Sequence, residues 1–549
     1  MSTCEGGTVV CICGCCCVHG GAKLEEIKPH PVSEQFPGVE YCVNSPPPWP
    51  ETFLLGFQHY IVSLGATVLI PSIFVNQMGE DEKSKVIQTL LFVSGLNTLL
   101  QTLFGTRLPS VIGGSYSFII PMTSILHAKR FDHMSPDPCG SDCTNHRFEE
   151  TMRGMQGALI VASCFQMVIG FLGVWRNVVR YLTPLSMVPL MTFTGLGLYY
   201  LGFPLLARCV EIGLPELILM AILSQASTYA LSTTGLIDRY GVLFSVAFVW
   251  AYAEILTSGG TYDKASSDSR AVCRTNGSRN INGAPWIYIP YPFQWGTPTF
   301  RAGEAFAMMA ASLVASVEST GTFLATSRYG SATPVPPSVL SRGVGWLGFG
   351  TLLAGLFGSV TGSTASVENA GLLAITRVGS RRVIQVSAGF MMFFSILGKF
   401  GAFFASIPPA ILAALYCFFF GFVSSAGLGL LQYCNLNSLR TKSVLGFSFF
   451  LGLSVPQYFR DHQLSSGTSP VHTHSRWFND IATVIFASHA TVAALVAVLL
   501  DCTLFREDDE AGKNSGSQWW DKFVSYNRDV RSDDFYKLPC KLNKLFPPL

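Results

Sequence analysis

TLLQTLFG, at residues 98–105, recurs as TLLAGLFG at residues 351–358, with six of the eight positions identical and an offset of 253 residues. This offset is about half of the apolar region, so the match predicts a chain built from two related halves. Apolar sequence of low complexity could also produce such a match by chance. At the same offset, Gly113-Gly114-Ser115-Tyr116 aligns with Ser366-Val367-Glu368-Asn369.

Apolar runs surround both copies of this octapeptide. A helix needs about 17 to 25 such residues to cross the hydrocarbon of a membrane. Two runs, at 109–127 and 362–378, are doubtful because they are short and rich in Gly, Ser and Thr. Roughly 12 others are clear, at 53–76, 86–104, 157–175, 183–206, 213–230, 240–257, 304–326, 343–360, 383–402, 405–430, 443–457 and 482–500.

The composition also indicates a membrane protein. Only 13% of the residues are charged, against about 25% in soluble domains. The formal net charge of +2 leaves no excess for binding nucleic acid. The expected spans contain no His-Glu-x-x-His pattern, so we expect neither an intramembrane metalloenzyme nor a cofactor. We predict an all-α polytopic membrane protein with about 14 spans, in which an odd number per half inverts the second repeat.

Polar stretches divide the chain into five expected regions. These are a cytoplasmic N-terminal tail (1–50, Cys-rich at its start), a first seven-span repeat (51–257), an extracellular loop (258–302), a second seven-span repeat (303–500) and a cytoplasmic C-terminal tail (501–549). From about residue 505 the mixed charges favour a solvated tail.

Two polar loops, 128–156 and 258–302, carry features typical of an extracellular face. Asn276 begins an N-glycosylation pattern. Cys139, Cys143 and Cys273 lie in the same loops, where either a disulfide or free thiols are compatible with the sequence.

The two doubtful runs predict the binding site. Backbone that is not helical at membrane depth leaves polar groups unpaired unless they line a cavity or bind a ligand. Ionisable residues inside spans are functional candidates for the same energetic reason. They are His59, Glu304, Glu318 and Glu368. Glu304 lies near a helix start, where a structural role is expected.

Each remaining candidate has a structural interpretation as well as a functional one. Glu318 lies in mid-span with Thr322 one turn away, so it is either a coupling site or a buried hydrogen-bonding group. Glu368 either caps a helix or accepts hydrogen bonds from a ligand. His59, beside Gln58, either orients a neighbouring helix or contacts the substrate.

The aromatic residues of the first doubtful run are a further candidate feature. Tyr116 and Phe118 offer ring faces on which a planar ligand could stack. Aromatic residues are common throughout this chain, so ordinary packing would also account for them.

Residues 368–377, ENAGLLAITR, resemble the signature of the nucleobase-ascorbate transporter family, Q/E/P-N-x-G-x-x-x-x-T-R/K/G. The resemblance covers roughly residues 30–549. Further segments resemble motifs of the family and of its plant branch, namely Phe57-Gln58-His59, Pro46–Pro50, Val317–Thr322, Ala332–Ser338 and Gly379–Arg382.

The resemblance implies two inverted seven-span repeats, arranged as a core domain and a gate domain that dimerises, and an elevator-like movement. It implies that Glu318 accepts substrate N–H groups, that Glu368 occupies the specificity position and that Tyr116 stacks on the substrate. Ser115, Phe118 and Asn369 complete the expected substrate site, Thr376 and Arg377 form a filter-like end, and Gln58 and His59 orient the site.

Two departures from the family pattern bear on the substrate and the coupling ion. This chain has Thr322 where many members have Asp, so we expect Glu318 and Thr322 to form the ion-coupling site, with Glu318 as the proton carrier. It has Glu368 where ascorbate carriers have Pro, and two nearby carboxylates would repel the ascorbate anion. We therefore expect a proton-coupled nucleobase symporter in the plasma membrane, in contact with lipid. The alternatives are a sodium-coupled ascorbate carrier and a channel or anion exchanger of the same fold.

Overall fold

The computed structural model describes residues 38–78, 83–126, 140–226, 236–263, 266, 272–275, 286–399, 403, 406–466, 469–504, 535–539 and 542. The Cys-rich start of the chain, Cys139 and Asn276 lie outside these residues, as does the side chain of Cys143. Within them the regular secondary structure is helical, apart from two short strands and an isolated β-bridge; turns and loops connect these elements.

The described part of each expected apolar run falls on helices, preceded by a short strand in the runs at 109–127 and 362–378. The first half contains α1 (Trp49–Met78), α2 (Lys83–Leu103), β1 (Ile112–Gly114), η2 (Tyr116–Phe118), α3 (Ile119–Leu126), α4 (Gly140–Phe171), α5 (Val174–Arg180), α6 (Pro184–Leu196), η4 (Tyr199–Leu201), α7 (Phe203–Leu206), η5 (Ala207–Cys209), α8 (Val210–Ala226) and α9 (Leu236–Ser258). The second contains α12 (Ala302–Tyr329), α13 (Pro337–Phe357), β2 (Ser363–Ala365), α14 (Val367–Thr376), α15 (Arg381–Ile396), α17 (Pro409–Leu428), η7 (Gly429–Tyr433), α18 (Leu439–Ser466), α19 (Arg476–Phe486) and α20 (His489–Thr503).

Seven of the described helices are long and apolar enough to cross a membrane, and the bent pair α19 and α20 would make an eighth. This count is below the expected 14 because several apolar runs are divided into shorter helices. The run at 183–206, for example, is interrupted at Gly197 and Gly202, between which the chain forms η4. The polar loop expected at 128–156 is also too long, because α4 begins at Gly140.

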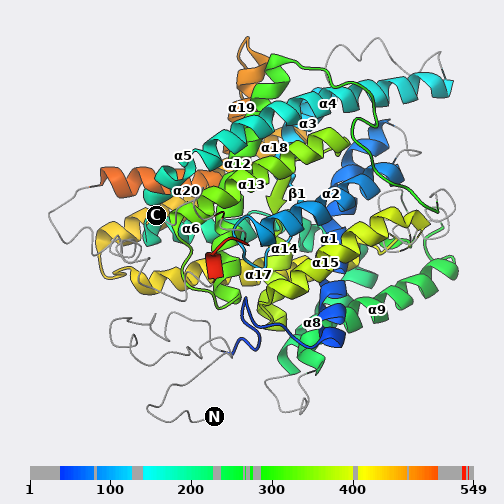
Figure 1. Ribbon diagram of the computed structural model, residues 1–549, viewed down its shortest axis with the longest axis horizontal. Helices are drawn as coiled ribbons and strands as arrows, with labels where there is room; N and C mark the ends of the chain where they lie inside the picture. The colour runs from blue at the N-terminus through cyan, green and yellow to red at the C-terminus, as the bar shows by residue number, and fades with distance from the viewer. Residues whose placement is uncertain are drawn as a thin grey trace.

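The helices pack as two groups. The first helix group contains α1, α2, η2, α3, α4 and α12 to α15, and α4 packs along α13 while α15 packs against α1 and α2. The second helix group contains α6, η4, α8, α9, α17, α18 and α20, in which α6 contacts both α17 and α20. In Figure 1, β1 and α14 lie near the centre of the molecule, with α1, α2 and α15 to the right and α6 and α20 to the left.

The two doubtful runs meet at this centre as an antiparallel strand pair. Gly113 of β1 lies opposite Thr364 of β2, and Ser115 and Ser366 follow the two strands as caps of the next helical turns. The non-helical stretches that the sequence predicts in these runs are therefore present. The alignment at an offset of 253 is wrong here, because β1 begins at 112 and β2 at 363, an offset of 251. Ser115 therefore corresponds to Ser366, and Ser117 to Glu368.

Glycines permit this close pairing. A Cβ atom on Gly362 would lie 2.4 Å from Cζ of Phe118, and one on Gly114 would lie 2.8 Å from Cγ2 of Thr361. Real Cβ atoms do not approach other atoms so closely. Gly358 adopts φ +74° after α13, the left-handed conformation that ends a helix. The Gly-rich composition of the doubtful runs thus has a steric reason.

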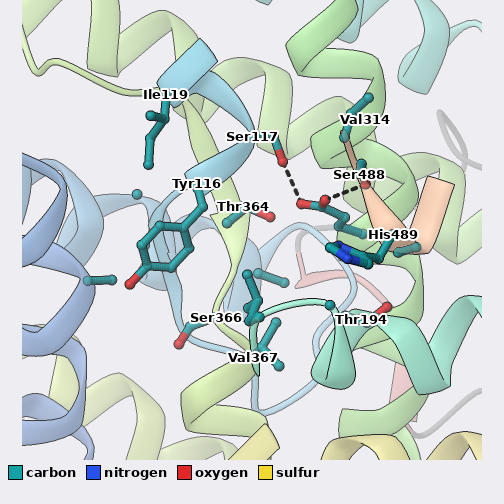
Figure 2. A pocket seen from close by; sticks show the side chains of 18 of the residues that line it. Tyr116, Ser117, Ile119, Thr194, Val314, Thr364, Ser366, Val367, Ser488 and His489 are labelled. Carbon is teal, nitrogen blue, oxygen red and sulfur yellow. Dashed lines mark hydrogen bonds between the residues drawn. The ribbon is translucent and has the colours of Figure 1, made fainter. Parts of the chain in front are cut away.

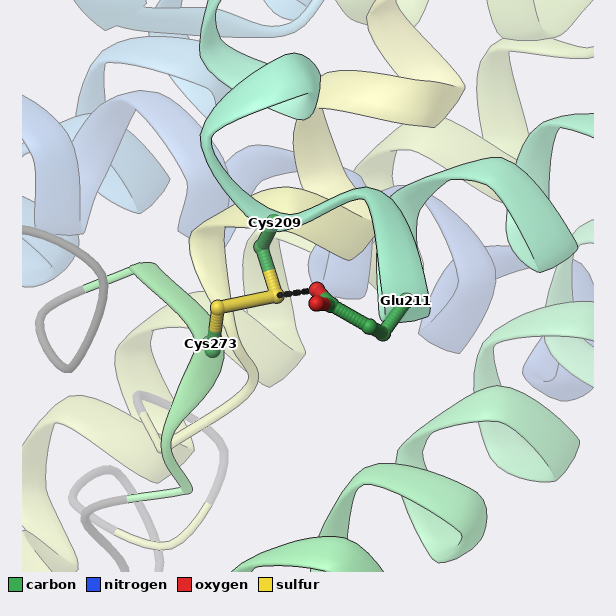
Figure 3. Close-up of side chains that lie close together, drawn as sticks. All are labelled: Cys209, Glu211 and Cys273. Atoms are coloured by element: carbon green, nitrogen blue, oxygen red, sulfur yellow. Dashed lines mark hydrogen bonds between the residues drawn. A yellow bond between two sulfur atoms is a disulfide. The ribbon is translucent and has the colours of Figure 1, made fainter. Parts of the chain in front are cut away.

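A disulfide joins Cys273 to Cys209, with Cα atoms 5.5 Å apart (Figure 3). Cys209 ends η5, directly before α8, and lies outside the two polar loops that the sequence singled out. Of the two alternatives that the sequence left open for Cys273, the disulfide is therefore the one present, with a partner outside those loops. Spacing along the chain did not reveal that the α8 end lies beside the segment after α9.

Part of the C-terminal tail is packed, contrary to the expectation of a solvated segment. Phe535 and Tyr536 are buried, and their carbonyl oxygens accept hydrogen bonds from Arg381 (3.0 Å) and Arg342 (3.1 Å). The Tyr536 hydroxyl donates to the carbonyl of Thr333 (2.5 Å). Two basic side chains of α13 and α15 thus bind the tail through its backbone.

Candidate functional site

A cavity of about 400 Å³ lies between the two helix groups, beside the strand pair. The first group lines it with residues of α1, η2, α12 and the start of α14. The second group lines it with residues of α6, η4, α18 and the start of α20. A site at this boundary can change shape whenever one group moves relative to the other.

Glu318 is the most fully hydrogen-bonded carboxylate of the cavity. It lies in the middle of α12, and its Oε2 accepts a hydrogen bond of 2.5 Å from Ser117 Oγ. Its Oε1 accepts a second, of 2.8 Å, from Ser488 Oγ. Figure 2 shows the two serines on opposite sides of the carboxylate. Ser117 belongs to η2 and Ser488 precedes α20, so Glu318 is held by both helix groups.

Glu368 also lines the cavity, from the first turn of α14. Ser366, and not Glu368, caps this helix, because Ser366 Oγ accepts from the Asn369 backbone N–H at 3.2 Å. The same hydroxyl donates to Glu368 Oε2 at 2.7 Å. The structure thus separates the two roles that the sequence left open. Serine caps the helix, and the carboxylate faces the cavity.

The first doubtful run divides its aromatic residues between cavity and interior. Tyr116 lines the cavity, whereas Phe118 is fully buried against Gly362 and does not line it. Ser115 is also fully buried, and its backbone pairs with the Thr361 hydroxyl (N–H 3.1 Å, C=O 2.9 Å). Of these three expected substrate contacts, only Tyr116 reaches the cavity.

Asn369 and His59 form a buried link between α14 and α1. His59 Nδ1 donates to Asn369 Oδ1 at 2.8 Å, and Asn369 Nδ2 donates to Ser63 Oγ at 3.0 Å. Neither Asn369 nor His59 lines the cavity, and neither does Gln58, which is fully buried. The geometry supports the expected orienting role of His59 and places Asn369 in that role as well.

The remaining expected residues lie away from the cavity surface. Thr322 donates to the Glu318 backbone carbonyl at 3.1 Å, and Thr376 donates to that of Leu372 at 2.9 Å. Arg377 is exposed at the opposite end of α14 from Glu368. The Thr322 hydroxyl is therefore bound within its own helix and not to the carboxylate.

The second helix group contributes residues that sequence reasoning missed. The run at 482–500 is not one straight helix, because α19 and α20 meet at an angle of 80° at Ala487 and Ser488. Ser488 caps α20, and its position before an apolar run is a helix-start signal that could have been found. A hydropathy window averages over such a break and does not detect it.

His489 and Arg460 line the second group's side of the cavity. His489 is 6% exposed, and within the described part of the chain its Nε2 has no hydrogen-bond partner. The Arg460 guanidinium of α18 lies over the Tyr200 ring, 3.6 Å from its centroid. The cavity is therefore lined by two carboxyl groups from the first helix group and by the Arg460 guanidinium, the His489 imidazole and the Tyr200 ring from the second.

Comparison with known proteins identifies the family. A model described as "Permease family" matches residues 50–461, more than half of the chain. The chain is 58% identical over 535 residues to "Putative nucleobase-ascorbate transporter 10" of Arabidopsis thaliana, covering 96% of this chain and 97% of that protein. It is 52% identical over 530 residues to "Nucleobase-ascorbate transporter LPE1" of Zea mays, covering 96% and 99%.

Among solved structures, the chain is similar to the one titled "The overall structure of SLC26A9", with a TM-score of 0.45 and 11% identity over 83% of this chain and 66% of that one. The family match and the plant relatives confirm the resemblance carried by residues 368–377, and they identify a membrane transporter of a small molecule and not an enzyme. The chain belongs to the nucleobase-ascorbate transporter family.

Proposed function

We propose that this protein carries a nucleobase across the plasma membrane by proton symport. The proposal rests on one observation: Glu318, Glu368 and Tyr116 line the same cavity, beside the strand pair and between the two helix groups. No cofactor is needed for this function. The substrate is a small planar base, such as xanthine, uric acid, uracil, adenine or guanine.

The lining chemistry favours a base over ascorbate. Carboxylates accept hydrogen bonds from imide or lactam N–H groups, and such charge-assisted bonds are about twice as strong as neutral ones. The Tyr116 ring offers a stacking face, and His489 and Arg460 offer polar contacts to exocyclic oxygens. The ascorbate anion would be repelled by two buried carboxylates.

Glu318 is the proposed proton carrier. It is mid-helix and hydrogen-bonded by two hydroxyls, which stabilise the charged form before a proton or substrate N–H arrives. Thr322 stands where many family members have Asp, so this position offers no carboxylate to sodium. Its hydroxyl donates instead to a backbone carbonyl of its own helix. A proton is therefore the favoured coupling ion.

The first helix group is the proposed core domain and the second the gate domain. The antiparallel strands, each followed by a serine cap and a short helix, support two inverted seven-span repeats. Movement of the core along the gate would then carry the cavity from one side of the membrane to the other. We further propose a homodimer that is embedded in lipid.

Uptake of labelled bases and of ascorbate tests the proposal, in cells lacking their own carriers, at acidic and neutral outside pH, with and without sodium. We expect saturable, acid-stimulated uptake of at least one base. Sodium-driven ascorbate uptake would overturn both the substrate and the ion. Uptake that does not saturate would indicate a channel.

A further inference from the structure

Glu318 receives its two hydrogen bonds from different helix groups. Ser117 and Glu318 both belong to the first group, so they move together in any displacement of that group. Ser488 belongs to the second group, and its bond to Glu318 Oε1 crosses the boundary. Any sliding of one group past the other must break this second bond and leaves the first intact.

We propose that Ser488 is a positioning residue that latches the first helix group to the second until the substrate displaces its hydroxyl from Glu318. This inference rests on the proposed transport function and deepens it. A substrate N–H bound to Glu318 Oε1 would take the place of the serine hydroxyl. The loaded group would then move without leaving a buried carboxyl oxygen unpaired.

The latch explains how proton movement is tied to substrate. A protonated but empty Glu318 still accepts a hydrogen bond from Ser488, because a carboxylic acid keeps acceptor capacity. Moving in that state would strip the hydrogen bond from a buried polar group, which is unfavourable. In the conformation that has this bond, the protonated carrier without substrate is therefore held in place and does not carry protons alone.

The start of α20 reinforces the contact. Ser488 Oγ also accepts a hydrogen bond from the Thr491 backbone N–H at 3.4 Å, as the cap of a 15-residue helix. This second bond fixes the serine hydroxyl so that its single proton points to Glu318. The positive end of the helix dipole lies near the carboxylate and favours its charged form.

Other titratable and charged groups share this cavity, so a pH profile alone would not isolate the latch. They are Tyr116 of η2, Glu368 of α14, Tyr200 of η4, Arg460 of α18 and His489 of α20. A test must therefore compare variants that leave all of these groups unchanged.

Ser117 provides the matched control. Ser117→Ala and Ser488→Gly each remove one hydroxyl bond to the same carboxylate, but only Ser488→Gly removes a bond across the boundary. Glycine retains most of the N-cap preference, so α20 still begins normally. Ser488→Thr keeps both the cap and the hydroxyl and should restore the latch.

Proton entry into liposomes that contain the purified full chain and a pH-sensitive dye, with no substrate, measures the latch. We expect Ser488→Gly to raise the substrate-free proton flux about fivefold, the factor expected from one lost hydrogen bond to a neutral, protonated carboxyl group. Wild type and Ser488→Thr should show no increased proton flux, and Ser117→Ala, which keeps the bond across the boundary, should show a smaller increase than Ser488→Gly. Equal fluxes in Ser488→Gly and Ser117→Ala would overturn the latch.

Base uptake by the wild type, measured in the same vesicles, separates this inference from the proposed function. Acid-stimulated wild-type uptake together with a tight Ser488→Gly variant would refute the latch alone. A leaking Ser488→Gly variant in vesicles whose wild type carries no base would support the latch and refute the assigned substrate class.

Discussion

The segments 112–126 and 363–376 are built on the same plan but present different chemistry. Each has a three-residue strand, a serine cap and a short helix. One residue after the cap, the first segment has Tyr116 and the second has Val367. Two residues after it, they have Ser117 and Glu368. The repeat thus fixes the shared backbone, and two positions after each cap decide what the cavity offers.

The functional difference follows from hydrogen-bonding roles. The first segment supplies a ring and a hydroxyl donor, which is used by Glu318. The second supplies a carboxylate acceptor, which is bonded by its own cap. A planar base needs both a stacking surface and acceptors for its N–H groups, so the unlike halves suit one ligand.

We expect the largest loss of transport from replacing Glu318, the carboxylate that accepts a hydrogen bond from Ser117 of the first segment. Glu318→Gln removes the proposed proton carrier but keeps a group of similar shape that can accept hydrogen bonds. Acid stimulation should disappear, and the initial rate of base uptake at acidic outside pH should fall by about 100-fold. Radiolabel uptake at two outside pH values measures this. Retained accumulation against a pH gradient would show that another group carries the proton.

The close packing that both segments share can be disrupted by adding a methyl group at Gly362. Gly362→Ala places a Cβ 2.4 Å from Phe118, whereas Gly113→Ala, on the paired strand, meets nothing within 4 Å. Overpacking costs about 1–3 kcal/mol, so the first variant should have the lower melting temperature and surface level. Thermal unfolding of the purified variants checks this, and equal melting temperatures would contradict the tight pairing.

Glu368, the carboxylate of the second segment, should affect the affinity for the base more than the coupling to protons. Glu368→Gln keeps an acceptor but loses the charge, so the KM for the base should rise about tenfold, the factor for a weakened charge-assisted bond. Stimulation by acid should persist. Competition by unlabelled bases measures the change, and a loss of pH response with unchanged KM would reverse the roles assigned to Glu368 and Glu318.

Thr322→Ala is expected to have the smallest effect, although the sequence had grouped this residue with Glu318 in ion coupling. Its hydroxyl contacts a helix carbonyl and not the cavity. Uptake rate and pH response should change less than about twofold, as for a helix hydroxyl bonded one turn back. A tenfold loss, with a normal surface level, would restore Thr322 to the coupling site.

Several features could be predicted from the sequence because they depend on neighbouring residues. Apolar runs, Gly-rich interruptions and the signature at 368–377 are all local patterns, and they located the two non-helical stretches, Glu318 and Glu368. Phe118 was placed in the site wrongly by the same logic, since spacing alone does not say which of two nearby rings is buried. The structure puts Phe118 beneath Gly362 and leaves Tyr116 in the cavity.

The sequence by itself determined a helical membrane transporter with two interrupted runs, because hydrophobicity and backbone propensity act over one turn or one span. Only the tertiary structure decided that Ser488, 170 residues from Glu318 in the chain, completes its hydrogen bonds. It alone paired Cys209 with Cys273 and bound the tail at Tyr536. Such contacts depend on how helices pack against one another, and that packing leaves no periodic mark on either segment alone.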